Sequence, residues 1–99
     1  MLIYHFVLPE TWENFKDKDF YEAESLQTEG FIHCSFAHQI SAVLERYYAD
    51  KKHVLILTID TAELTSKVIE EPSTNNEIYP HIYGGINRGA IVDIEQRNL

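Results

Sequence analysis

The stretch "FIHCSFAHQISAVLERYY" (residues 31–48) joins two kinds of periodicity, that of a strand and that of a helix. Its first part is aromatic and β-branched and follows Gly30, which predicts a short strand. Because side chains alternate along a strand, Phe31, His33 and Ser35 are expected on one face. His33 is therefore expected to point the same way as Ser35.

The second part of this stretch predicts the best-defined helix of the chain. Ile40, Val43, Leu44 and Tyr47 recur at the spacing of an amphipathic helix. Ser35 stands before them as the expected N-terminal cap. The stretch therefore predicts a strand that leads directly into a helix.

The segments before it predict another strand and another helix. "LIYHFV" (Leu2–Val7) is β-branched and aromatic, and Pro9 ends it, which is typical of a strand. From Pro9 to about Lys16, acidic residues in the first turn and the spacing of Trp12 and Phe15 predict a short amphipathic helix.

The second half of the chain is richer in strand patterns. "HVLILTID" (His53–Asp60) is almost continuously apolar, which predicts a central strand covered on both faces. Asp60 and Glu63 have capping-box spacing for one helical turn. Strands around 67–71 and 90–95 and a loop at 72–77 complete an α+β fold, expected as a single domain over residues 1–99 with a mixed, mainly antiparallel sheet and two main helices.

Composition restricts the function classes. No apolar run approaches the roughly 20 residues of a membrane span, and the first residues lack the pattern of a signal peptide. The single Cys34 cannot form an internal disulfide. A soluble cytoplasmic protein without a membrane partner is the expectation.

The charge balance is acidic, with 16 Asp and Glu against 8 Lys and Arg and a formal net charge of −8. Such a chain repels polyanions, so a nucleic-acid partner is not expected. A small nucleotide or metabolite is the expected ligand.

Three histidines, His5, His33 and His81, fall on or beside predicted strands, whereas His38 and His53 stand at element ends and are expected to be exposed. A histidine in an apolar strand is commonly satisfied by one or two hydrogen bonds and has no other role. The alternative is that the three form a site.

Two further readings concern metals and thiols. Imidazole suits zinc, but the chain has no local His-x-x-x-His pair, so a metal site would have to be assembled from distant strands. That site is a third alternative, and no metal ligand is assigned. His33 and Cys34 are strand neighbours on opposite faces, so His33 is not placed to activate the thiol. Cys34 is expected to be a buried small hydrophobe.

The segment around Pro72 and the glycines near the C-terminus leave two alternatives open. Glu71 is either part of a solvated acidic strand end or an inward-facing carboxylate. Tyr83 with Gly84 and Gly85 is a candidate pocket wall, since glycine lets a ligand approach the backbone.

Several motifs together resemble the domain of unknown function 952 family. They span nearly the whole chain, and the two most specific are "EGFIHCS" (residues 29–35) and "PHIYG" (residues 80–84). The others are Tyr4-His5, Trp12, Ser25-Leu26, Gln39 and Glu71.

More distantly, the chain resembles the ADP-ribosyltransferase fold, which includes RNA 2'-phosphotransferases that use NAD. The resemblance implies that His5 on the first strand and His33 on the strand before the helix contact ligand. It implies hydrogen bonds from both histidines to ribose hydroxyls or a phosphate. No glutamate stands at the late-strand position of that fold, so Glu71 is its spatial substitute, orienting the attacking group.

The resemblance thus implies a catalytic set of His5, His33 and Glu71. The implied ligand-binding residues are Ser35, His81, Tyr83, Gly84 and Arg88. The implied function is a nucleotide-binding enzyme that uses NAD as substrate in glycosyl or phosphoryl transfer, or an inactive relative of such enzymes. The alternative is a non-catalytic binding or protein-interaction domain in which the histidines are structural.

Overall fold

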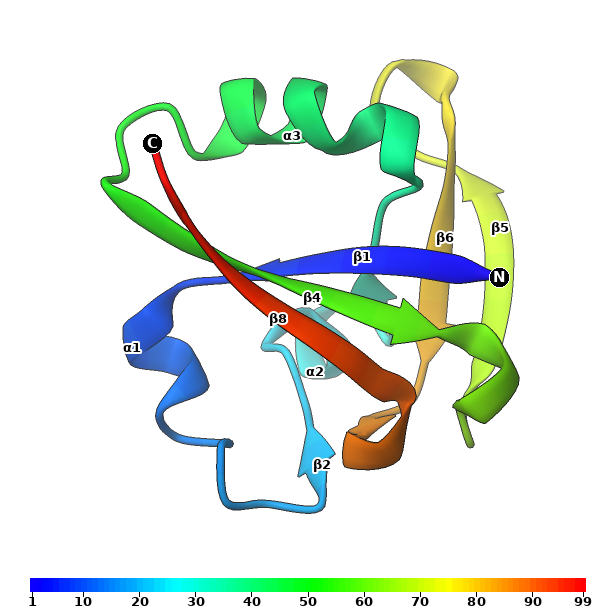
Figure 1. Ribbon diagram of the computed structural model, residues 1–99. Helices are drawn as coiled ribbons and strands as arrows, with labels where there is room; N and C mark the ends of the chain where they lie inside the picture. The colour runs from blue at the N-terminus through cyan, green and yellow to red at the C-terminus, as the bar shows by residue number, and fades with distance from the viewer.

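The computed structural model describes residues 1–99 and arranges them as three small sheets with one longer helix, α3 (Figure 1). The strands are β1 (Leu2–Val7), β2 (Phe20–Tyr21), β3 (Ile32–His33), β4 (His53–Asp60), β5 (Lys67–Pro72), β6 (Ile78–Tyr83), β7 (Ile86–Asn87) and β8 (Ile91–Asn98). The helices are α1 (Pro9–Trp12), α2 (Ser25–Thr28) and α3 (Ile40–Tyr47), with 3-10 turns η1 (Ala37–Gln39), η2 (Thr61–Glu63), η3 (Thr74–Asn76) and η4 (Arg88–Ala90).

The sheets have the orders β1-β4-β8, β2-β7 and β3-β6-β5. Every strand pairing among them is antiparallel, so the α+β class and the mainly antiparallel pairing are confirmed, whereas the parallel pairing that a mixed sheet requires is wrong. An isolated bridge between Tyr4 and Ser35 joins β1 to the segment after β3. This bridge brings the first strand and the strand-helix unit side by side.

Strand β4 lies at the centre of its sheet and is covered on both faces, as its apolar run predicts. One face contributes Leu55, Leu57 and Ile59 to the larger hydrophobic core. The other face contributes Val54 and Ile56 to a smaller core beneath α3. The two cores together bury β4 almost completely, which is why its sequence lacks the alternation of a half-exposed strand.

Helix α3 is confirmed, but the expected cap at Ser35 is wrong. Gln39 precedes α3, but its side chain caps none of the amides of that helix; its side-chain oxygen reaches back and accepts a hydrogen bond from the Phe36 amide at 2.9 Å. Its amide nitrogen donates to Glu77 at 2.7 Å and to the Ile78 carbonyl at 2.8 Å. The backbone of Ser35 is instead used in the bridge to β1.

The expected helix from Pro9 to about Lys16 is too long, because α1 ends at Trp12. The next residues form tight turns, and the guanidinium of Arg88 donates to the carbonyls of Phe15, Lys16 and Lys18. Those carbonyls are satisfied from the far end of the chain and need no continuing helix. The fold therefore has one main helix, α3, and not two.

The remaining elements largely follow the patterns. Strands β5 and β8 are confirmed, and Asp60 caps η2 by accepting a hydrogen bond from the Ala62 amide. The loop at 72–77 contains η3, where Asn75 and Asn76 have left-handed φ angles of 57° and 64°. None of the helices combines the length and apolarity needed to cross a membrane.

Candidate functional site

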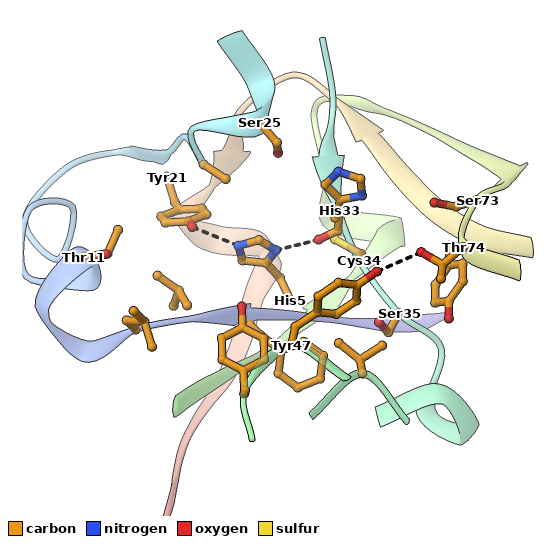
Figure 2. Close-up of a pocket in the computed structure, with 17 residues that line it drawn as sticks. His5, Thr11, Tyr21, Ser25, His33, Cys34, Ser35, Tyr47, Ser73 and Thr74 are labelled. Carbon is orange, nitrogen blue, oxygen red and sulfur yellow. Dashed lines mark hydrogen bonds between the residues drawn. The ribbon is translucent and has the colours of Figure 1, made fainter. Parts of the chain in front are cut away.

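A pocket of about 520 Å³ opens between β1, the segment after β3, α3 and the η3 loop (Figure 2). That volume is within the range of small-molecule sites. Of the 17 lining residues, 10 are hydrophobic, and none is Lys, Arg, Asp or Glu. The polar wall consists of two histidines and several hydroxyl groups, including those of Thr11, Tyr21, Ser25, Ser35 and Thr74.

His5 stands on β1 at the base of the pocket and is held at both ring nitrogens. Nδ1 is 2.6 Å from the His33 carbonyl, which can only accept, so Nδ1 carries the hydrogen. Nε2 is 2.8 Å from the Tyr21 hydroxyl. Burial lowers the pKa of His5 to about 4, so the ring is neutral near pH 7. Figure 2 shows His5 between its two partners.

Tyr21 is fixed by this arrangement. Since Nε2 of a neutral His5 is an acceptor, the Tyr21 hydroxyl donates to it, and its oxygen keeps lone pairs for a donor in the pocket. The Tyr21 ring packs against Trp12 and Phe15, with centroids 5.8 Å and 5.1 Å away. Burial raises the pKa of Tyr21, so it stays protonated. Tyr21 thus offers an acceptor where His5 has no free nitrogen.

His33 stands at the rim of the pocket, with its side chain about half exposed. Its Nε2 lies 3.0 Å from a Glu29 carboxylate oxygen, and its ring meets the rings of Phe31 and His81 edge to face. The backbone carbonyl of the same residue orients His5. His33 therefore stands between the pocket and the aromatic rings of Phe31 and His81.

Two hydroxyl groups bridge the mouth of the pocket. Tyr47, in the last turn of α3, hydrogen-bonds Thr74 of η3 at 2.9 Å, and both residues line the pocket. Ser35 also lines the pocket and is buried, and its role as a ligand contact stays a prediction. The predicted residues His5, His33 and Ser35 are thus brought together in one pocket.

Glu71, His81 and Tyr83 form a second cluster that does not line the pocket. One oxygen of Glu71 accepts from His81 Nδ1 at 2.8 Å and from the Tyr83 hydroxyl at 2.6 Å. The bond from Tyr83, with that from His81, lowers the pKa of Glu71, and the same Tyr83 bond raises the pKa of Tyr83. Phe31 stacks on His81 at 4.1 Å, and Nε2 of His81 is buried without a partner.

Gly84 and Arg88 lie outside the pocket lining and hold the fold locally. Gly84 has φ of 151°, and a Cβ there would stand 2.4 Å from the Ser66 hydroxyl, so only glycine fits. Arg88 binds the carbonyls that follow α1. Their roles as ligand contacts stay predictions.

Sequence reasoning missed Tyr21 and the hydroxyls of Thr11 and Ser25. Tyr21 belongs to a strand of two residues, too short for a periodic pattern, and its partner lies 16 positions away. Ser25 belongs to one of the motifs of the family resemblance, which was the available signal for it.

The structure brings no three His, Cys, Asp or Glu side chains into a metal-binding group. His38, His53 and Cys34 are as expected, the first two exposed and the thiol buried.

Solved structures with this fold exist. The crystal structure of protein CC0527 from Caulobacter crescentus has a TM-score of 0.89 at 20% identity, over 100% of this chain and 88% of that chain. A double mutant of that protein has a TM-score of 0.88 at 19% identity, with the same coverage. Its solution NMR structure has a TM-score of 0.79 at 20% identity, over 99% of this chain and 84% of that chain.

At these identities the likeness concerns the fold alone. No curated protein matches the sequence. The family model described as "Protein of unknown function (DUF952)" matches residues 6–94, which is most of the chain. The chain therefore belongs to the DUF952 family.

Proposed function

We propose that the pocket binds the nucleoside part of a small nucleotide, with NAD as the first candidate. The observation that carries the proposal is the Tyr21–His5 pair, which presents a fixed oxygen acceptor inside a wall of hydroxyl groups. Ribose hydroxyls both donate and accept hydrogen bonds, so they suit such a wall. The hydrophobic part of the lining suits a flat base.

The charge of the lining limits how a nucleotide would sit. Since no Lys or Arg lines the pocket, the phosphates belong at its mouth and in solvent. His33, half exposed at the rim, is a side chain there that is able to donate a hydrogen bond to a phosphate. The buried part of the ligand is therefore the uncharged nucleoside.

The likeness to ADP-ribosyltransferases is part of this proposal. In its support, His5 on the first strand and His33 before the helix line the same pocket. Against turnover, the lining contains no carboxylate, and His5 is neutral with both nitrogens engaged. We therefore propose binding without transfer, with Glu71 outside the contact set.

The test is a backbone amide NMR titration with NAD, ADP-ribose and adenosine. We expect shifts at Tyr21, His33 and Ser35 with all three compounds, since they share a nucleoside. Tyr21→Phe removes one neutral hydrogen bond and should weaken binding about threefold to tenfold. The matched control is Tyr83→Phe, a tyrosine outside the lining, which should leave the affinity unchanged.

Two outcomes would contradict the proposal. A titration without shifts at millimolar ligand would remove the nucleotide assignment and leave the protein-interaction domain with structural histidines. Release of nicotinamide from NAD, followed by chromatography, would instead show that the pocket supports turnover.

A further inference from the structure

We propose that β8 is an interaction edge that pairs antiparallel with β8 of a second copy of this chain. Strand β8 lies at the edge of its sheet and pairs with β4 on one side only. Figure 1 shows it across the front of the molecule with no element covering it. Unpaired backbone N–H and C=O groups along an edge are a template for another strand.

The other sheet edges are shorter or already used. On the far side of the same sheet, β1 is bonded to Ser35. The edge strand β5 has six residues, begins with a lysine and ends at Pro72, which lacks an amide hydrogen. Strand β8 has eight residues and no proline. It is therefore the edge best able to accept a new strand.

Two apolar side chains of β8 are unusually exposed to solvent. Val92 is 54% exposed and Ile94 44%, and neither packs against the two cores. A second strand paired over residues 93–99 would remove Ile94 from water, whereas Val92 lies just beyond that segment. That burial favours association.

Charge complementarity selects a second copy as the partner. Asp93, Glu95 and Arg97 lie on one face of β8, because they alternate with the apolar residues. An antiparallel pair with Gln96 on its two-fold axis sets Arg97 of each copy opposite Glu95 of the other. Arg97 already binds Glu95 within the chain at 2.9 Å and 3.2 Å, so the two groups can share bonds across the axis.

The register of β8 agrees with this axis. Its pairing with β4 is regular from Asp93 to Asn98 and shifts between Thr58 and Ile59, near Ile91. Gln96 therefore stands in the regular part, and the irregular end lies away from the axis. Each copy has a formal net charge of −8, but at about 150 mM salt charges beyond roughly 8 Å are screened. Local pairs then decide the association.

The first test is sedimentation equilibrium of the wild-type chain at about 150 mM salt. We expect a concentration-dependent dimer. Arg97→Glu sets like charges across the axis and should weaken the dimer at least about tenfold. The double swap Glu95→Arg with Arg97→Glu restores opposite pairs and should restore the dimer. A wild-type chain that stays monomeric, or a double swap no better than Arg97→Glu, would overturn the proposal.

The second test fixes the register. Opposite Cα atoms across antiparallel strands lie about 4.5–5.5 Å apart, within the Cα range of a disulfide, so Gln96→Cys should form a cross-link between copies under mild oxidation. Asp93→Cys, which meets no equivalent residue in this register, is the control, and the buried Cys34 should stay unreacted. Equal cross-linking of both variants, or none in a dimeric Gln96→Cys chain, would sink the register. Thermal unfolding of each variant separates lost pairing from lost folding.

Discussion

His5 and His81 are two buried histidines on strands, and their surroundings differ. His5 has a partner at each ring nitrogen in a region without charged side chains. His81 has one partner, the carboxylate of Glu71, and its Nε2 has none. Burial is alike, 6% and 3% exposed, so burial alone does not tell which histidine the fold depends on.

The two histidines differ in the hydrogen-bonding groups that each ring satisfies. His5 serves two other groups, the buried Tyr21 hydroxyl and the partly buried His33 carbonyl, and removing it takes away the partner that each has in His5. His81 serves one carboxylate that is one-third exposed and also bonded by Tyr83. The side of the molecule around His5 is therefore expected to be the more sensitive to substitution.

The largest effect is expected from His5→Phe. It keeps a ring but removes the partner of the buried Tyr21 hydroxyl and of the partly buried His33 carbonyl, so the free energy of unfolding should fall by about 2–4 kcal/mol. Urea denaturation followed by tryptophan fluorescence of Trp12 measures it. A loss below about 1 kcal/mol would show that water or rotation replaces both bonds.

The next effect is a pH dependence that belongs to His5. The folded pKa is about 4 against an ordinary value of 6.5, so between these values the unfolded chain binds a proton that the folded chain excludes. The free energy of unfolding should therefore fall by about 3 kcal/mol as pH drops from 6.5 to 4.

The bonds from Tyr83 and His81 lower the pKa of Glu71, so protonating this carboxylate in acid also lowers the free energy of unfolding. The pH dependence of the wild type alone therefore does not isolate the contribution of His5. The measurement is the difference between wild type and His5→Phe in urea denaturation at several pH values. That difference should shrink toward pH 4. If the difference stays constant, His5 is protonated in the folded state, and the assignment of a neutral ring is wrong.

A smaller effect is expected from His81→Phe. The substitution removes the unpartnered Nε2 together with one bond to Glu71, and a phenyl ring can keep the stack on Phe31. The free energy of unfolding should change by about 1 kcal/mol or less. A loss as large as that of His5→Phe would erase the contrast between the two histidines.

The smallest effect concerns Tyr83 and not stability. The bond from its hydroxyl to Glu71 raises the pKa of Tyr83, so Glu71→Gln should bring that pKa back toward the ordinary value. Ultraviolet titration of tyrosinate, with Tyr83→Phe to identify the group, measures the change. An unchanged titration would mean that the carboxylate does not hold the hydroxyl.

Periodicity predicted the elements that have many local repeats. Helix α3 and strands β1 and β4 follow from patterns within about a dozen residues. The family resemblance pointed to His5 and His33, which share the pocket. These parts of the fold and the site depend on information that a sequence carries locally or through its relatives.

The rest depends on pairings between distant residues. Arg88 binds carbonyls about 70 positions earlier, which ends α1 early, and nothing near Trp12 signals it. Tyr21 meets His5 only because β2 pairs with β7. Glu71 meets His81 through the register of β5 and β6, which sets Glu71 opposite Tyr79 and outside the pocket lining. Such contacts follow from register, and composition does not encode register.

Cys34, the single thiol, is a natural probe of how often the pocket wall opens. It is 3% exposed, it lines the base of the pocket, and burial raises its pKa, so a thiol reagent reacts only when this region opens. The rate at which a thiol reagent labels the native chain thus reports the opening of the pocket wall. A ligand bound against that wall would lower the labelling rate of Cys34, whatever the chemical identity of the ligand.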